Sequence, residues 1–269
     1  MLQQPQAEME SLGQMISHLH KEGFEKSIFQ YVRCFLDIDN ETVLIYPGDR
    51  RPRILHSRAT VRLVHERLET DYVLGTYLLD PFYALHTDAA PAGLYTLNQI
   101  APDQFKRTEY YSAYYRRTTV VDELVYVAYP APNVSVHLSV GRDAASGQRF
   151  SKREIERARL LVPVLRAASE QHWANLRSNF RDREQSEPDA FQERLELDLG
   201  ISLTPRQAQV ALLILRGHSS VSISLRLEIS EQTVKVFRKQ LYRKCKISSQ
   251  AELFSLMMPV LSKIATRSC

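Results

Sequence analysis

Apolar residues in the first part of the chain recur at intervals of three and four, which is the spacing of a helix with one buried face. The longest of these stretches follows Ser151, a good N-cap residue, and Glu154 completes a capping box with it. Pro163 should kink or split this helix, because proline has no N–H for the helical hydrogen bond. The pattern predicts helices over residues 9–20, 24–35, 59–79, 103–117 and 152–176.

Between these helices the pattern changes to β-branched and alternating residues, which is typical of strands joined by short turns. Residues 47–49 (Pro-Gly-Asp) and 130–133 (Pro-Ala-Pro-Asn) supply the turn chemistry. Helices around antiparallel strands define an α+β domain, an antiparallel sheet flanked by helices. We expect two hairpins, 42–46 with 53–56 and 120–129 with 134–140, and mostly loop over 84–101.

Charged and polar residues dominate positions 177–198, which also contain Pro188. This composition predicts a linker with room for a short helix at 189–197. We therefore divide the chain into an α+β domain for ligand sensing and dimerisation (1–177), a linker (178–200) and a C-terminal domain (201–269).

Capping signals divide the C-terminal domain into short helices. Thr204 with Gln207 and Ser249 with Glu252 have the spacing of capping boxes. Residues 228–230, Glu-Ile-Ser, have the length of the tight turn in a helix-turn-helix. These signals predict an all-α domain of four helices, over 204–216, 220–227, 231–245 and 250–262.

The third of these helices has two different faces. One face is apolar and should enter the core: Val234, Phe237, Leu241 and Cys245. The other is mostly basic: Lys235, Lys239, Tyr242 and Lys246, with Val236 and Arg243 beside them. Such a helix can lie in the major groove of DNA, where cations donate to guanine and small apolar groups contact thymine. The alternative is an ordinary amphipathic helix with a solvated basic face; the capped partner helix and the tight turn favour DNA.

Composition and charge support a chain of two domains, of which the C-terminal one binds DNA. The chain has 269 residues, 44% hydrophobic and 25% charged, as expected for a soluble protein of two domains. From residue 200 onward there are eleven Lys/Arg and three Asp/Glu, whereas the residues before hold 24 and 28. A basic tail on an acidic body favours a polyanion as the partner of the tail. Three widely spaced cysteines, with no secretory signal and no long apolar run, predict a cytoplasmic protein that does not enter the membrane.

The spacing of motifs in the C-terminal domain resembles the LuxR/FixJ type of helix-turn-helix regulator. The matching positions are Leu203, Thr204, Arg206, Gly217, Ser219, Ile223, Leu227, Ile229, Ser230, Thr233, Val234, Lys235 and Ile247. The resemblance implies a third helix that reads the major groove, usually as a dimer on a near-palindromic site. It suggests Lys235, Val236 and Lys239 as base-edge readers, with hydroxyls and cations nearby on phosphates. The predicted DNA-binding set is Thr204, Ser219, Ser230, Thr233, Lys235, Val236, Arg238, Lys239, Arg243 and Lys246.

The chain departs from that family pattern at several positions. A common glutamate is Gln207, a common Glu-Ile-Ala is residues 222–224 (Ser-Ile-Ser), and a common arginine is Gln250. Phe237 stands for a histidine and Cys245 for a leucine, and both keep the face apolar. The fold should therefore survive, whereas the loss of the cation at position 250 puts one phosphate contact in doubt.

The N-terminal domain of such a regulator can be of several kinds. The aspartate cluster of a phosphorylated receiver cannot be assembled here. The pattern of Tyr72 or Tyr77 ahead of Asp80 and Pro81 resembles acyl-homoserine-lactone receptors, but the pocket tryptophans of that family are missing, since Trp173 lies far beyond their expected position. The order of elements also resembles GAF/PAS sensors of small molecules, which we prefer.

Tyrosines and phenylalanines gather in two stretches of this domain, more than a surface helix needs. Large amphipathic rings suit a pocket or an interface, and a nearby carboxylate could hold a cationic or amine ligand. The alternative is that most of these rings belong to the core and its rim. The predicted ligand-binding set is Tyr72, Tyr77, Phe82, Tyr83, Tyr95, Tyr111, Tyr115 and Asp122.

No other polar group indicates chemistry of its own. The eight histidines have no metal-ligand spacing, and Ser135 and His137 share a strand face without a nucleophile motif. We therefore expect no enzyme, no metal and no cofactor. The sequence predicts a homodimeric regulator of double-stranded DNA that responds to a small-molecule effector; the alternative is an N-terminal domain that binds a partner protein instead.

Overall fold

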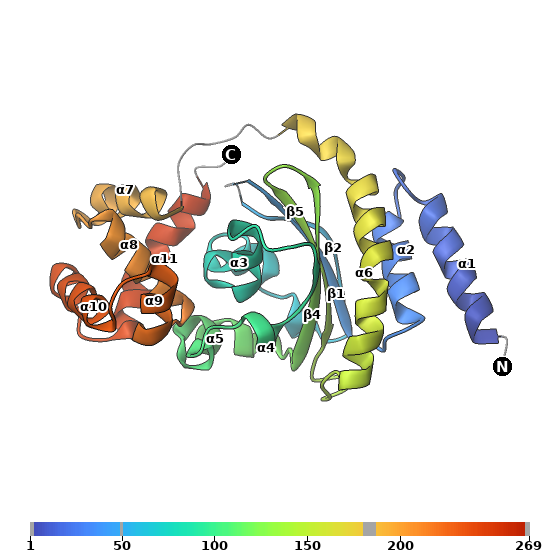
Figure 1. The fold of residues 1–269 in the computed structure, drawn as a ribbon, viewed down its shortest axis with the longest axis horizontal. Coiled ribbons are helices and arrows are strands. Elements are labelled where there is room, and N and C mark those ends of the chain that lie inside the picture. Colours follow the sequence, from blue (N-terminus) through green and yellow to red (C-terminus); the bar gives the residue numbers. More distant parts are fainter. Residues whose placement is uncertain (1–2, 49–50, 180–186, 267–269) are drawn as a thin grey trace.

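The chain folds into an N-terminal α+β unit and a C-terminal helical unit (Figure 1). The computed structural model describes residues 3–48, 51–179 and 187–266. In the first unit a sheet lies between two helical layers, as the sequence predicted. One layer consists of α2 (Phe24–Arg33) and α6 (Lys152–His172), with α1 (Gln3–Ser17) packed outside them; the other contains α3 (Pro81–Thr87), α4 (Leu97–Ile100) and α5 (Glu109–Ala113).

The sheet has five antiparallel strands in the order β2-β1-β5-β4-β3. The strands are β1 (Asn40–Pro47), β2 (Arg53–Ala59), β3 (Gly93–Thr96), β4 (Asp122–Ala131) and β5 (Val134–Arg142). Both predicted hairpins are confirmed, because β1 pairs with β2 and β4 with β5. The expectation of mostly loop over 84–101 is wrong, because this stretch contains the end of α3, the short edge strand β3, which is fixed by its pairing with β4, and α4.

Side chains of the central strands alternate between two covered faces of the sheet. On β5, Val136 and Leu138 pack toward α2 and α6, whereas Ser135 and His137 lie on the opposite face, toward α3. β4 follows the same rule, and its Tyr126 donates a hydrogen bond to a carbonyl of α6. Because both faces are covered, Ser135 and His137 are buried as deeply as the apolar residues of β5, and Ser139 is half-buried.

In the helical layer that contains α3, α4 and α5, two predictions are wrong. Continuous helices were expected over 59–79 and 103–117, and both stretches are instead broken into short turns. Gly75 interrupts the first with a φ of +157°, and Thr108 starts a new helix in the second by accepting a hydrogen bond from the N–H of Tyr111. The observed elements are η1 (Arg62–Val64), η2 (Leu68–Tyr72), η3 (Thr76–Leu79), η4 (Phe105–Arg107), α5, and η5 (Tyr115–Thr118).

The long helix α6 begins as its sequence indicates. The Ser151 hydroxyl accepts from the N–H of Glu154, and the Glu154 carboxylate accepts from the N–H of Ser151 at 2.8 Å. The helix packs on the sheet through Leu161 and Leu165 and continues past Pro163. Leu160, although apolar, is 77% exposed.

The C-terminal unit confirms the predicted four-helix arrangement. Its helices are α8 (Pro205–Arg216), α9 (Ser220–Leu227), α10 (Glu231–Cys245) and α11 (Gln250–Thr266). They are preceded by α7 (Glu187–Leu199), which includes the short helix expected in the linker. Phe191 and Leu195 of α7 are fully buried among the helices of this unit. No helix within the described part of the chain is long and apolar enough to cross a membrane.

Candidate DNA-binding surface and ligand cavity

A tight turn joins α9 to α10. Glu228 ends α9 in a left-handed conformation with a φ of +54°, and two residues later the Ser230 hydroxyl caps α10 by accepting from the N–H of Thr233 at 3.0 Å. The same hydroxyl lies 2.7 Å from the Thr233 hydroxyl. These local bonds fix the angle at which α10 leaves the turn, as a helix-turn-helix requires.

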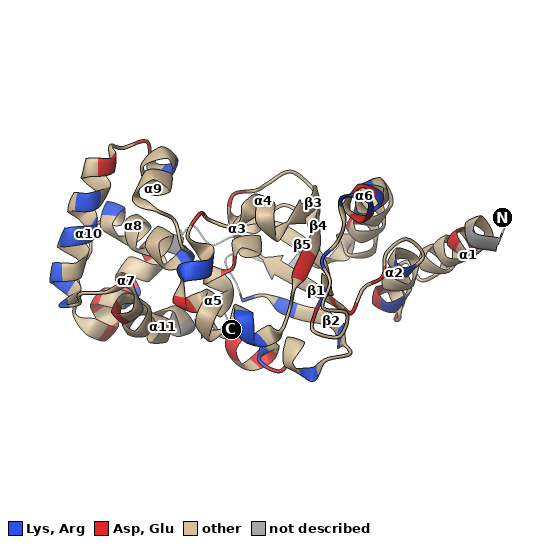
Figure 2. Ribbon diagram, turned by 90° about the horizontal axis from the view of Figure 1, so that it is seen from below, with Lys and Arg blue, Asp and Glu red and all other residues tan. Residues whose placement is uncertain are grey.

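α10 separates its apolar and basic side chains as predicted. Val234 and Leu241 are fully buried against the neighbouring helices, while Lys235, Lys239 and Arg243 are exposed. Figure 2 shows basic residues along the side of α10 that faces away from the N-terminal unit. A cationic face on a helix that is anchored by its opposite face has the form needed to enter a major groove.

Several of the predicted DNA-binding residues already have partners within the unit. Arg238 lies over the Tyr242 ring and donates to its hydroxyl, and Lys235 pairs with Glu231 at 2.8 Å. The remaining members are a partly exposed apolar residue of α10, Val236; an exposed residue after α10, Lys246; and two N-cap residues, Thr204 of α8 and Ser219 of α9.

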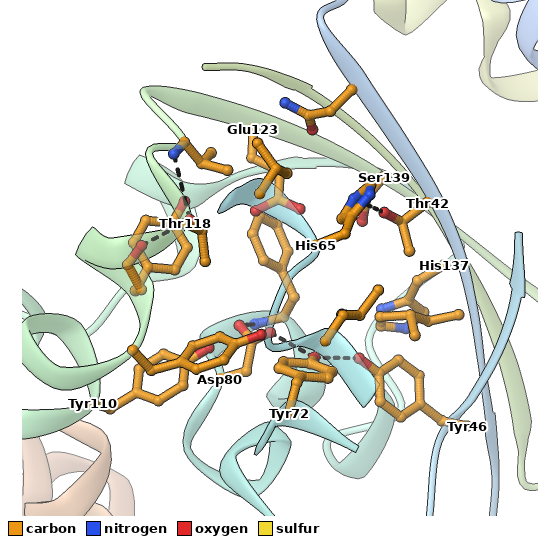
Figure 3. Close-up of a pocket in the computed structure, with 18 residues that line it drawn as sticks. Thr42, Tyr46, His65, Tyr72, Asp80, Tyr110, Thr118, Glu123, His137 and Ser139 are labelled. Atoms are coloured by element: carbon orange, nitrogen blue, oxygen red, sulfur yellow. Dashed lines mark hydrogen bonds between the residues drawn. The ribbon is translucent and has the colours of Figure 1, made fainter. Parts of the chain in front are cut away.

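A partly enclosed cavity of about 70 Å³ lies between the sheet and the second layer of the N-terminal unit. Figure 3 shows its wall, with polar side chains from β1, β4 and β5 facing tyrosines and an aspartate from the short turns and helices. The polar residues of the wall include Thr42, Tyr46, His65, Tyr72, Asp80, Tyr110, Tyr114, Tyr115, Thr118, Glu123, His137 and Ser139.

One chain of hydrogen bonds crosses the floor of this cavity. The Tyr72 hydroxyl donates to the Asp80 carboxylate at 2.6 Å, and the Tyr46 hydroxyl lies 2.7 Å from that of Tyr72. The other oxygen of Asp80 accepts from the N–H of Phe82 and so caps α3, with Pro81 in its first turn. Of the two tyrosines considered ahead of Asp80, Tyr72 donates its hydroxyl proton to the Asp80 carboxylate, and the Tyr77 carbonyl accepts from the Asp80 N–H.

Burial changes the ionisation of the carboxyl groups in this wall. It raises the pKa of Asp80 to about 6, although hydrogen bonds from Tyr72 and the N–H of Phe82 act against it. Burial, followed by the charge of Asp80, raises the pKa of Glu123 to about 8. Ser139 and Tyr115 oppose that shift only in part. Uncompensated carboxyl groups in a cavity are typical of functional sites.

The structure brings together part of the predicted ligand set. Tyr72, Phe82 and Tyr115 line the cavity, and the rings of Tyr77 and Tyr83 pack edge to face behind it, 4.9 Å apart. Tyr95, Tyr111 and Asp122 lie outside the lining: they bond to the Pro91 carbonyl, stack on Tyr115, and accept from the N–H of Phe150, respectively.

Several wall residues escaped the sequence prediction, above all Glu123 and His137. Neighbours on a strand point to opposite faces, so Asp122 and Glu123 cannot both enter the cavity. β5 contained a usable signal, because Ser135, His137 and Ser139 alternate with apolar residues on a strand that lies between β1 and β4 in the sheet. Trp173, in contrast, packs on Phe24 in the outer layer.

The two units touch through the segments that follow the cavity wall. The Asp103 carboxylate accepts from the N–H of Ser219 at 3.0 Å, at the start of α9. The Arg216 guanidinium donates to the Leu78 carbonyl at 3.0 Å, and Arg226 forms an ion pair with Asp88. Leu78 lies two residues before Asp80. The contact between the two units therefore involves a residue that is close in sequence to the cavity wall.

Gly217 is the tightest point of this contact. It ends α8 with a φ of +95°, and its carbonyl accepts from the N–H of Gln104. A Cβ at this position would lie 2.6 Å from a side-chain carbon of Thr108 and 3.1 Å from the backbone of Phe105. Both the left-handed cap and the close approach require glycine here.

A histidine in the same contact is held neutral. Burial, together with Arg226 and Arg216, lowers the pKa of His218 to about 4, although Asp103 and Asp88 act in the opposite direction. Its ring lies 2.8 Å from the Ser222 hydroxyl. Protonation of His218 would therefore oppose the docked arrangement of the two units.

Comparison with known proteins agrees with this architecture. Residues 201–257 match the family described as bacterial regulatory proteins, luxR family. The chain is 30% identical over 185 residues to the "Putative HTH-type transcriptional regulator in exeN 3'region" of Aeromonas salmonicida, covering 66% of this chain and 93% of that protein. It is 46% identical over 52 residues to the response regulator protein TodT of Pseudomonas putida, covering 19% of this chain and 23% of TodT.

The N-terminal unit has its own structural relative. The crystal structure of the VqsR LBD domain from Pseudomonas aeruginosa superimposes with a TM-score of 0.52 at 30% identity, covering 61% of this chain and 94% of that domain. Of the sensor classes expected, the comparison thus supports a ligand-binding-like domain of the kind found in LuxR-type proteins.

Fold, surface and comparisons define a transcriptional regulator with a C-terminal DNA-binding helix-turn-helix. The chain belongs to the luxR family of bacterial regulatory proteins.

Proposed function

We propose that the N-terminal unit senses a small molecule and thereby controls how a dimer of this chain binds a near-palindromic operator. The observation that carries the proposal is the cavity of about 70 Å³, walled by buried and half-buried polar groups, whose supporting segments touch the DNA-binding unit. Its volume suits a small molecule and leaves no room for a segment of a partner protein, which favours the small-molecule effector over the protein-binding alternative.

On the DNA side, Lys235, Val236 and Lys239 are proposed to read base edges. Arg238, Arg243, Lys246 and the hydroxyls of Thr204, Ser230 and Thr233 are proposed to hold phosphates. The exposed cations of α10 support these roles, because phosphate contacts supply most of the affinity for DNA and base contacts supply the sequence preference. Two-fold operators favour a dimer, in which α6 is proposed to take part.

The contact between the units supplies a route for control. The carboxylate of Asp103 occupies the N-terminus of α9, where a DNA phosphate would otherwise be favoured by the free N–H groups and the helix dipole. A ligand that repositions Asp80 or Tyr110 would shift the adjoining segments that carry Leu78 and Asp103. Binding in the cavity would then change how readily α9 and α10 approach DNA.

The first experiment isolates an operator by selection from random duplex DNA with the full chain, then measures affinity by fluorescence anisotropy. Lys239→Ala should weaken binding to the selected site by about 1–3 kcal/mol and change binding to scrambled DNA much less. Lys26→Ala removes the same charge from an exposed position of α2, which lies on the far side of the molecule, and should change neither (Figure 1).

Equal losses of Lys239→Ala on both DNAs would contradict its role as a base reader. Affinity should also fall with salt by about 0.9 logarithmic units per phosphate neutralised for each tenfold rise in salt. A flat salt dependence would contradict the proposed phosphate contacts.

The proposed sensing of a small molecule is tested separately, by thermal shift of the full chain against a metabolite panel, since a ligand stabilises the state that it binds.

A further inference from the structure

The polar groups of the cavity wall can be assigned as donors or acceptors by following their hydrogen bonds. One chain starts at the carbonyl of Gly48, which can only accept, so the nitrogen of His86 that lies 2.8 Å away must donate. Burial lowers the pKa of His86, so this ring is neutral and its other nitrogen, Nδ1, is an acceptor. The Ser135 hydroxyl, 2.8 Å from Nδ1, must therefore donate its one proton to His86.

His137 completes this chain and leaves an acceptor unused. Its Nε2 lies 3.2 Å from the Ser135 oxygen and donates to it, because the Ser135 proton is already engaged. Burial and the nearby His86 lower the pKa of His137 well below its ordinary value, so the ring is neutral and Nδ1 carries a lone pair. Nδ1 is buried without a hydrogen-bond partner, in a side chain that is 1% exposed and borders the cavity beside Tyr46 (Figure 3). An orphaned acceptor of this kind indicates a missing donor.

The carboxyl groups add to this surplus of acceptors. Glu123 and Asp80 border the same cavity from different elements, β4 and the start of α3 (Figure 3). No lysine, arginine or tryptophan is found among the described residues that line it. Arg67, which lies over the Tyr114 ring, is already paired with Asp71 and with the Ala113 carbonyl. Hence no fixed cation in the wall balances the two carboxyl groups.

Tyrosine rings form the rest of the wall. Tyr46, Tyr72, Tyr110, Tyr114 and Tyr115 border the cavity, and the faces of such rings attract cations. A metal ion is a poor match, because the described residues contain no group of three His, Cys, Asp or Glu side chains that could hold one. The wall therefore suits an organic cation that offers several N–H donors.

We propose that the cavity binds a small ligand through a primary ammonium group, with Glu123 and Asp80 as charged acceptors, His137 Nδ1 as a neutral acceptor and the tyrosine rings around it. The inference rests on the proposed sensing function and names its ligand class. An ammonium group carries three donors and no acceptor, which complements this wall. A ligand that presents only carbonyl groups would leave His137 Nδ1 without a donor and the two carboxyl groups without a counter-charge.

The test uses the full chain and a fixed set of probes: primary alkylamines of one to four carbons, each compared with the primary alcohol of the same length. Binding is measured by isothermal titration calorimetry. At least one amine should bind about tenfold or more tightly than its alcohol, and Glu123→Gln should weaken that amine by about tenfold or more, since charge-assisted hydrogen bonds are lost. Asp122→Asn is the matched control on the opposite face of β4 and should weaken binding far less than Glu123→Gln does, although the Asp122 charge also helps to raise the pKa of Glu123.

A second measurement needs no variant. Glu123 is protonated at neutral pH in the free protein, in surroundings that include Asp80, Asp122, Tyr115, Ser139 and the neutral ring of His137. An ammonium ligand should ionise Glu123 and release a proton, which calorimetry in buffers of different ionisation enthalpy detects. Amines that release no proton, alcohols that bind equally well, or a Glu123→Gln variant with unchanged affinity would each overturn the proposal. If no amine binds, this ligand class is wrong; a response to another compound in the metabolite panel would leave the sensing function standing.

Discussion

The DNA-binding surface and the ligand cavity place their polar groups in opposite surroundings. On α10 the functional side chains Lys235, Lys239 and Arg243 lie in water, and the apolar residues beneath them hold the helix. In the cavity the functional candidates Asp80 and His137 are buried and Glu123 is half-buried, and burial shifts the pKa of each. On α10, the residues proposed to bind DNA are therefore different from those that stabilise the fold. In the cavity, the residues proposed to bind the ligand also affect the stability of the fold.

This difference has a physical cause. An exposed cation loses little solvation in the folded state, so its removal hardly alters the free energy of unfolding. A buried carboxylate without a counter-charge costs stability unless it takes up a proton or meets a ligand that supplies the missing charge. The luxR-type unit can therefore exchange its DNA-reading residues freely, whereas every change in the cavity should alter the stability and sensing of the N-terminal unit together.

The largest expected effect comes from a substitution on the buried face of α10. Leu241→Ala should lower the free energy of unfolding of this unit by about 2–5 kcal/mol, because it opens a cavity under a fully buried side chain. Lys239→Ala, two residues earlier and exposed, should change it by less than about 0.5 kcal/mol. Differential scanning calorimetry of both variants checks this pair. Equal destabilisation would show that the two faces of α10 are not independent.

An intermediate effect concerns pH and the cavity. The folded chain raises the pKa of Glu123 to about 8, so between its ordinary value and pH 8 the unfolded chain ionises this group more readily. Stability should therefore fall as the pH rises through this window, and Glu123→Gln should remove that part of the slope. The variant should be more stable than the wild type at pH 8 by a few kcal/mol, since one pKa unit corresponds to about 1.4 kcal/mol.

Urea unfolding at pH 5, 7 and 9 measures this slope. Asp122→Asn supplies the control, because its side chain lies outside the cavity and its amide oxygen can still accept from the N–H of Phe150. Parallel curves for Glu123→Gln and the wild type would show that Glu123 is not the group responsible.

The smallest expected effect lies where the two regions meet. Asp103→Ala should raise the affinity of the ligand-free chain for DNA about two- to fivefold, because a carboxylate no longer occupies the start of α9. Asp37→Ala removes an exposed carboxylate from the segment between α2 and β1 and should change nothing beyond its general charge effect. Anisotropy titrations at one salt concentration compare the two. Weaker binding by Asp103→Ala would show that the contact assists DNA binding.

The sequence by itself determined those parts of the protein whose signals are local. The caps at Thr204, Ser230 and Ser151 and the glycine at position 217 set the limits of α8, α10 and α6, because capping depends on residues within one turn. The two faces of α10 also follow from spacing alone. Two hairpins and the four-helix unit could be predicted for the same reason.

Only the tertiary structure decided the rest. The stretches 59–79 and 103–117 have helical spacing, yet they break into turns because their tyrosines pack around a cavity rather than along one face. The choice between Asp122 and Glu123 depended on the register of β4, and the orphaned nitrogen of His137 on partners from distant segments. The contact of Asp103 with Ser219 joins residues more than a hundred positions apart, which no local pattern encodes.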